Sequence, residues 1–296
     1  MRPAGGRDTA ARLGQTSLMS TNLFSLDGKT IIVTGGYGQI GRVVTLALLD
    51  AGATVAVIEP RPDDTVTKAR FGDAAAKIAV VKADVTSRGS LEDARAEIVK
   101  LFGAPHGLIN NAALDSPPDS SAAETGPFED YPESSWDKVM DVNAKGVFQC
   151  CQVFGKPMAD TGRGSIVNVA SIYGSVSPDQ GLYQYRRDRG EIFFKPVAYS
   201  ASKSALYNLT RYIAVYWGPK GVRANAVTFA GVFNNQDPQF LQNYAKKIPL
   251  RRAGKDGLHG MAEASDYAGP MVFLMSDASS YMTGADLRVD GGFLAL

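Results

Sequence analysis

A glycine-rich stretch at residues 34–41 lies between a short β-branched run and a helical pattern. The run at residues 30–33 is typical of a strand that is buried on both faces. The helical pattern continues to Leu49, and Gly52 follows where a helix would end. Because a strand, a tight turn and a helix follow one another closely, the segment predicts one βα unit of a parallel sheet.

The rest of the chain alternates in the same way. Further strands are predicted at residues 54–58, 78–81, 107–109, 165–169, 222–227 and 287–289, and helices at 91–101, 133–154 and 197–217. This alternation predicts an α/β fold, a single doubly wound domain with a mainly parallel sheet of seven strands over residues 23–296. Three irregular segments, 112–132, 177–196 and 229–260, follow strands, so we expect them at the ligand-binding carboxyl edge of the sheet.

The first 22 residues differ from the rest, because they contain three Arg, one Asp and many small or polar residues. They lack the apolar region of a secretory signal. We expect a flexible N-terminal extension. A transit peptide and a true start at Met19 are the alternatives.

Composition excludes several classes of function. The chain has 31 Lys+Arg and 30 Asp+Glu, a net charge of +1, so we expect no nucleic-acid or membrane partner. No stretch approaches the roughly 18 apolar residues of a membrane-spanning helix, which predicts a soluble protein. Cys150 and Cys151 are adjacent and match no disulfide or metal-ligand spacing. They predict buried, reduced thiols, as in the cytoplasm.

The glycine-rich turn has the spacing of a phosphate-binding loop. Such glycines allow a tight turn, close approach of a pyrophosphate and close packing of helix on strand, and the helix N-terminus offers free N–H groups to the anion. A plain glycine turn is the alternative. The cofactor contacts predicted here are Gly35, Tyr37, Gly38, Gln39, Ile40 and Gly41.

Glu59 ends the second predicted strand, about 20 residues after the turn, where an acid can bind the ribose hydroxyls of a dinucleotide. The same carboxylate would repel a 2′-phosphate, so we predict NAD as cofactor rather than NADP. Arg42 and Arg61 argue the other way, because either could pair with that phosphate.

Tyr199 and Lys203 are four residues apart at the start of a predicted helix, which places them on one face. An ammonium beside a phenol favours the phenolate and lowers its pKa from the ordinary value near 10. The pair therefore predicts acid–base chemistry near neutral pH.

These motifs occur in one order along the chain: the glycine turn, Asp84, Asn110-Asn111-Ala112, Asn143, Ser171, Tyr199/Lys203 and Val289-Asp290-Gly291-Gly292. In this order the chain resembles the short-chain dehydrogenase/reductase family, from about residue 23 to 293. The resemblance implies a Rossmann fold and an enzyme, an NAD(P)-dependent oxidoreductase that moves hydride between nicotinamide and a secondary alcohol or ketone.

The resemblance also implies residue roles. Tyr199 would be the acid/base, Lys203 would hold the nicotinamide ribose and tune Tyr199, Ser171 would bind the substrate oxygen, and Asn143 would support a water in the proton relay. Asp84 with Val85 would lie at the adenine, Asn111 with Ala112 near the adenosine ribose, and Val232 at the carboxamide.

Four departures from the family pattern stand out. Gln39 replaces the usual middle glycine, Ala113 replaces the glycine after Asn-Asn-Ala, and Phe229-Ala230 stands where Pro-Gly is common. The fourth is the gap of 27 residues between Ser171 and Tyr199, roughly twice the usual length.

We interpret residues 177–196 in that gap as an active-site insertion that bears on the substrate. It is rich in Tyr, Arg and Phe, which stack on rings and bind phosphate or carboxylate. A lid or an oligomer contact is the alternative. The chain is also similar to oxidoreductases associated with bacterial surface-sugar and flagellin modification, which suggests sugar derivatives as substrates.

Two other functions remain open, a sugar dehydratase or epimerase that uses bound NAD transiently, and a non-catalytic dinucleotide-binding module. The family resemblance implies a homodimer or homotetramer in which the predicted helices 133–154 and 197–217 pack between subunits.

Overall fold

The computed structural model describes residues 22–115, 123–251, 253–254, 257–258 and 260–296. Seven strands form one sheet in the order β3-β2-β1-β4-β5-β6-β9, and each neighbouring pair is parallel. The strands are β1 (Thr30–Thr34), β2 (Thr54–Glu59), β3 (Ile78–Lys82), β4 (Gly107–Asn110), β5 (Gly164–Ser171), β6 (Val222–Phe229) and β9 (Asp286–Val289). The predicted single α/β domain with a seven-stranded parallel sheet is confirmed.

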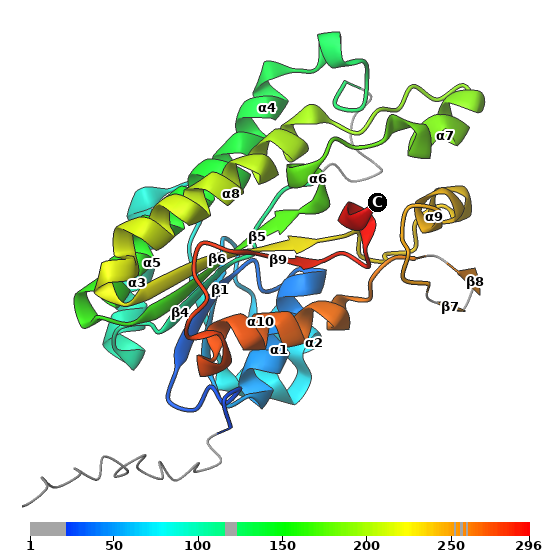
Figure 1. The fold of residues 1–296 in the computed structure, drawn as a ribbon. Coiled ribbons are helices and arrows are strands. Elements are labelled where there is room, and N and C mark those ends of the chain that lie inside the picture. Colours follow the sequence, from blue (N-terminus) through cyan, green and yellow to red (C-terminus); the bar gives the residue numbers. More distant parts are fainter. Residues whose placement is uncertain (1–21, 116–122, 252, 255–256, 259) are drawn as a thin grey trace, which may run out of the picture.

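The strands alternate with helices on both faces of the sheet (Figure 1). The helices are α1 (Gln39–Asp50), α2 (Asp64–Phe71), α3 (Arg88–Phe102), α4 (Glu133–Met140), α5 (Val147–Thr161), α6 (Ile172–Ser175), α7 (Gln184–Asp188), α8 (Val197–Trp217), α9 (Pro238–Ala245) and α10 (Ala268–Met275). A small antiparallel pair, β7 (Ala253–Gly254) and β8 (Gly257–Leu258), lies beyond the main sheet.

Two apolar layers hold the helices on the sheet. Successive strand residues point to opposite faces, so Ile32 of β1 packs with α3, α5 and α8, whereas Ile31 and Val33 pack with α1 and α10. Cys150 and Cys151 are buried free thiols in the first layer, as expected. Because both faces are covered, the carboxyl edge of the sheet is left to bind ligands.

A third apolar cluster covers part of this edge. We call it the cap cluster, and it consists of Ile172, Leu182, Tyr183, Phe193, Tyr244, Ile248 and Met261. It joins α6, the segment 177–196 and the segment around α9, which lie side by side in Figure 1. The two later irregular segments therefore fold onto each other, and they contain α7 and α9, which the sequence pattern did not reveal.

The helix predicted at residues 133–154 is present, and it changes its type once along its length. After α4, residues Asp141–Gly146 form a π-helical turn, and α5 then extends to Thr161. The helix thus continues beyond its predicted end at Phe154, through Gly155 and Pro157. Gly155 is needed there, since a Cβ at this position would collide with the ring of Trp217. Helices α2 and α10 were also not predicted.

In the part of the chain that the structure describes, no helix has the length and apolarity needed to span a membrane. The segment 1–22 proposed as an N-terminal extension falls, except for Asn22, outside the described residues.

Candidate active site

The glycine-rich turn forms a tight cradle between β1 and α1. Gly35 has a φ of +67°, which favours glycine, and a Cβ at Gly41 would collide with the Gly35 carbonyl oxygen. Gly38 is the N-cap of α1, and no side chain there caps the helix. The backbone N–H groups at this end are therefore available to an anion, which fits the pyrophosphate of a dinucleotide.

Glu59 lies at the end of β2, beside this cradle. Its side chain is buried, and Oε1 accepts a hydrogen bond of 2.7 Å from the Tyr37 backbone N–H. Burial raises the pKa of Glu59, while the bond from Tyr37 and the charge of Arg70 oppose that rise. The Tyr37 side chain turns to α2, where its hydroxyl lies 2.5 Å from the Thr67 hydroxyl.

The two arginines that argued for NADP differ in their surroundings. Arg42 donates through Nε to the backbone carbonyl of Arg70, which leaves the other donors of this guanidinium and its charge available. Arg61 lines the groove next to Glu59.

A groove of about 1600 Å³ runs from this cradle along the carboxyl edge of the sheet. The predicted site residues on its wall are Gly35, Gly38, Gln39, Ile40, Gly41, Glu59, Asp84, Val85, Asn111, Ala112, Ser171, Tyr199, Lys203 and Val232. Tyr37 and Asn143 are not among the residues that line it. The fold thus brings together, along one groove, side chains that are up to about 200 positions apart in the sequence.

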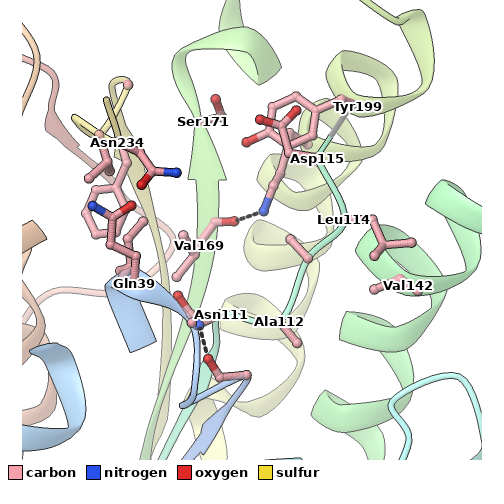
Figure 2. A pocket seen from close by; sticks show the side chains of 18 of the residues that line it. Gln39, Asn111, Ala112, Leu114, Asp115, Val142, Val169, Ser171, Tyr199 and Asn234 are labelled. Carbon is pink, nitrogen blue, oxygen red and sulfur yellow. Dashed lines mark hydrogen bonds between the residues drawn. The ribbon is translucent and has the colours of Figure 1, made fainter. Parts of the chain in front are cut away.

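Asn111 joins the two strands at the point where the strand order reverses. Its Nδ2 donates to the carbonyl oxygens of Thr34 at 3.1 Å and Gly35 at 3.0 Å, and Figure 2 shows it directly above the turn. Such crevices are where open α/β sheets bind their ligands. At this position Asn111 stabilises the cradle itself.

Lys203 and Tyr199 lie together on the first turns of α8, as their spacing predicts. The Lys203 ammonium is 5.9 Å from the centre of the Tyr199 ring and donates to the Val169 carbonyl at 2.7 Å (Figure 2). Burial lowers the pKa of Lys203 to about 8, and the nearby charge of Asp115 opposes that shift. An ammonium has three donors, so Lys203 can hold Val169 and still serve the groove.

The pKa of Tyr199 differs from the expectation. Burial raises the pKa of this phenol, the charge of Asp115 raises it further, and a hydrogen bond with Ser171 lowers it. The predicted lowering of this pKa is therefore wrong for the protein alone, because desolvation disfavours the phenolate.

Asn143 lies in the π-helical turn and is fully buried. Its Oδ1 accepts from the Leu114 N–H at 2.7 Å, and its Nδ2 donates to the Leu114 carbonyl at 2.8 Å and to Ser202 Oγ at 3.0 Å. The side chain therefore ties the segment after β4 to α8, one residue before Lys203.

The Phe229-Ala230 pair is held by Tyr267. The Phe229 ring stacks on the Tyr267 ring with centres 3.7 Å apart, and the Tyr267 hydroxyl donates to the Ala230 carbonyl at 2.8 Å. Val232 follows in a parallel bridge with Ala262. The missing Pro-Gly is thus compensated by an aromatic stack that fixes this end of the groove.

The insertion covers the groove, but its arginines already have partners. Arg186 pairs with Glu191 at 2.6 Å, Arg189 pairs with Asp237 at 3.3 Å, and Arg187 donates to two backbone carbonyls. The expectation that these arginines bind phosphate or carboxylate finds no support in these contacts.

Sequence reasoning did not single out two residues of the groove, Asp115 and Lys195, and it missed one contact of Gln39. Asp115 lies beside Tyr199 and Ser171 (Figure 2), and Lys195 of the insertion pairs with it. Gln39 was predicted for the cofactor but not for its contact with Phe233. The only sequence signals for Asp115 and Lys195 are an acid shortly after Asn-Asn-Ala and a lysine in the insertion, just before Pro196.

A parallel sheet with a glycine cradle, an acid at the second strand and a buried Tyr–Lys pair defines a dinucleotide-dependent oxidoreductase. A sequence profile of the family described as "Enoyl-(Acyl carrier protein) reductase" matches residues 35–294. The chain belongs to the short-chain dehydrogenase/reductase family. It is an NAD(P)-dependent enzyme that transfers hydride between nicotinamide and an alcohol/ketone pair.

Three known proteins illustrate the relationship. Galactitol 2-dehydrogenase of Rhizobium johnstonii is 33% identical over 273 residues, which cover 91% of this chain and 96% of that protein. NAD-dependent glycerol dehydrogenase of Listeria innocua is 30% identical, with 91% and 95% covered. The structure of a short chain dehydrogenase from Leptospira borgpetersenii with bound NAD+ aligns at a TM-score of 0.75, with 29% identity and 90% and 93% covered.

Proposed function

We propose that the protein oxidises a secondary alcohol of a neutral, polyhydroxylated small molecule with NAD, and catalyses the reverse reduction. The observation that carries this proposal is the cluster of Ser171, Tyr199 and Lys203 on the wall of the groove that also holds Glu59, with Ser171 and Lys203 buried. The names of the galactitol and glycerol dehydrogenases support the class of substrate.

Each residue of the cluster has a chemical task in this proposal. Ser171 hydrogen-bonds the substrate oxygen and Tyr199 accepts the carbinol proton, while Lys203 supplies positive charge beside the phenol. When bound, the nicotinamide accepts the hydride. Asn143 keeps α8 in place relative to the segment after β4, through its bonds to Leu114 and Ser202.

NAD is the proposed cofactor because Glu59 is a buried carboxylate at the cradle. A carboxylate accepts from ribose hydroxyls and repels a 2′-phosphate. We also propose that the other residues predicted from the sequence to contact the cofactor do so.

A neutral substrate is favoured over a phosphorylated one. Arg186 and Arg189 are paired with acids, so a phosphate that approached either arginine would meet the negative charge of Glu191 or Asp237. The proposed association with surface-sugar or flagellin modification therefore applies best to an uncharged sugar derivative.

The test is an assay of NAD and NADP reduction with polyols, simple secondary alcohols, sugar phosphates and nucleotide sugars. We expect turnover with NAD and neutral alcohols. In Tyr199→Phe, turnover should fall at least about a thousandfold, with NADH binding, measured by fluorescence, nearly unchanged. Substantial activity in this variant would contradict the assigned acid/base. Tightly retained NAD without net reduction would indicate the dehydratase or epimerase alternative. Binding of NADH without turnover of any substrate would indicate the non-catalytic module.

We also propose that residues 23–296 act as one dinucleotide-binding domain with 177–196 as its active-site insertion. The proposed assembly is a cytoplasmic homodimer or homotetramer. Exposed apolar side chains on α8, Tyr212, Val215 and Tyr216, support an interface on that helix.

A further inference from the structure

An ion pair from two separate loops lies next to the proposed acid/base. Lys195 comes from the insertion, and its Nζ is 2.5 Å from Oδ1 of Asp115, which lies in the segment that follows β4. The Lys195 side chain is 9% exposed and the Asp115 side chain 57%. Both residues line the groove, and Figure 2 shows Asp115 directly beside Tyr199.

The backbone of Lys195 is fixed at both of its polar groups. Its N–H donates to Gln180 Oε1 at 2.9 Å, and its carbonyl accepts from Gln180 Nε2 at 3.1 Å. The ammonium lies 5.2 Å from the centre of the Tyr199 ring. The insertion thus holds the Lys195 ammonium beside the phenol of Tyr199 and keeps this charged donor largely out of bulk solvent.

The charge of Asp115 is directed into the groove. After burial, which is the larger cause, this carboxylate further raises the pKa of Tyr183 and of Tyr199, which come from different elements. Because electrostatic influence falls with distance, a single acid that affects both phenols lies close to the reaction site.

We propose that Asp115 and Lys195 bind the hydroxyl on the carbon next to the reacting carbinol, and so select a vicinal diol. The inference rests on the proposed alcohol oxidation. A hydroxyl both donates and accepts, so it can donate to the Asp115 carboxylate and accept from Lys195. A carboxylate has several lone-pair sites and an ammonium three donors, so both can serve the substrate without losing each other.

The pair favours a hydroxyl over a charged substituent. A carboxylate or phosphate at this position would be attracted by Lys195 but repelled by the negative charge of Asp115. A cation would be attracted by Asp115 but repelled by Lys195. A methyl group at this position would displace water from Asp115 and Lys195 without offering them a hydrogen bond, which would weaken binding of the monoalcohol.

The experiment compares 2-butanol with 2,3-butanediol, which share a carbon skeleton and differ by one vicinal hydroxyl. The ratio of kcat/KM for diol over monoalcohol is measured with saturating NAD for the wild type, Asp115→Asn and Lys195→Met. We expect the wild type to prefer the diol, and each variant to reduce the ratio by about 10- to 100-fold. Because both alcohols use Tyr199, a change in the pKa of Tyr199 cancels in the ratio.

A second ion pair serves as a matched control. Lys29 and Asp277 lie 2.6 Å apart at the amino end of β1, also with the lysine largely buried and the acid exposed. Asp277→Asn should leave the ratio unchanged.

The outcomes separate the two proposals. Oxidation of 2-butanol without preference for the diol, or equal losses for both alcohols in the two variants, would overturn the diol inference and leave the proposed function intact. If the wild type oxidised neither of the two alcohols and no other member of the wider panel, both the diol inference and the proposed function would be overturned.

Discussion

At the residue scale, the chemistry depends on a few charged groups whose surroundings set their behaviour. Lys203 and Tyr199 are both buried, and burial disfavours the charged form of each. The protein therefore offers a phenol that holds its proton and an ammonium with a pKa of about 8. Asp115 acts on both groups and raises both pKa values.

The rate of alcohol oxidation should rise with pH across the neutral and alkaline range, and the rate of ketone reduction should fall. Oxidation needs the phenolate of Tyr199, whose fraction grows with pH, and the raised pKa moves that growth to higher pH. Asp115→Asn removes one cause of the rise, so its profile with 2-butanol should shift to lower pH. Rate profiles in both directions measure this, and a shift to higher pH would contradict it.

Glu59→Ala should narrow the preference for NADH over NADPH by about 10-fold, since it removes both the ribose acceptor and the charge that repels a 2′-phosphate. Dissociation constants from fluorescence titration provide the measurement. Glu59→Gln keeps an acceptor but loses the charge, so its preference for NADH over NADPH should lie between those of the wild type and Glu59→Ala. An unchanged preference would remove Glu59 from the cofactor site.

At the element scale, the departures from regular helices and from the family pattern occur where segments must meet. The π-helical turn places Asn143 where its amide can reach both Leu114 and Ser202. The insertion is not a free loop, because Tyr183 and Phe193 pack against the segment around α9. A sequence pattern shows the length of such segments, but their partners depend on which strand ends become neighbours.

Gln39 links two elements across the groove. Its Nε2 donates to the Phe233 carbonyl at 2.7 Å, and Figure 2 shows its side chain near Asn234, on the other wall. We expect Gln39→Ala to release NADH about 2- to 10-fold faster, the worth of one ordinary hydrogen bond. Stopped-flow displacement measures the rate, with the remote Gln152→Ala as control. Slower or unchanged release would show that this contact does not retain the cofactor.

At the scale of the whole molecule, α8 has two roles on opposite sides. Its inner face carries Tyr199 and Lys203, and its outer face exposes Val215, which is 79% exposed, between Tyr212 and Tyr216. An exposed apolar face of this kind favours contact with another chain.

Val215→Asp should convert the proposed homodimer or homotetramer into smaller species, because a buried unpaired carboxylate destabilises an interface. Size-exclusion chromatography with light scattering gives the mass, and Lys77→Gln, distant from α8, is the control. A wild-type protein that is already monomeric would refute the interface, as would an unchanged mass in the variant.

The residue order predicts the fold class, the alternation of strands and helices, and many of the residues on the groove wall. Local patterns suffice for these, since a strand buried on both faces and a glycine turn leave direct marks in the residue order. Only the folded chain reveals the π-helical turn at Asp141–Gly146, the raised pKa of Tyr199, the ion pairs of the arginines and the contact between Asp115 and Lys195. Burial and charge pairing depend on distances between residues remote in the sequence, and these distances exist only once the sheet has brought its carboxyl edge together.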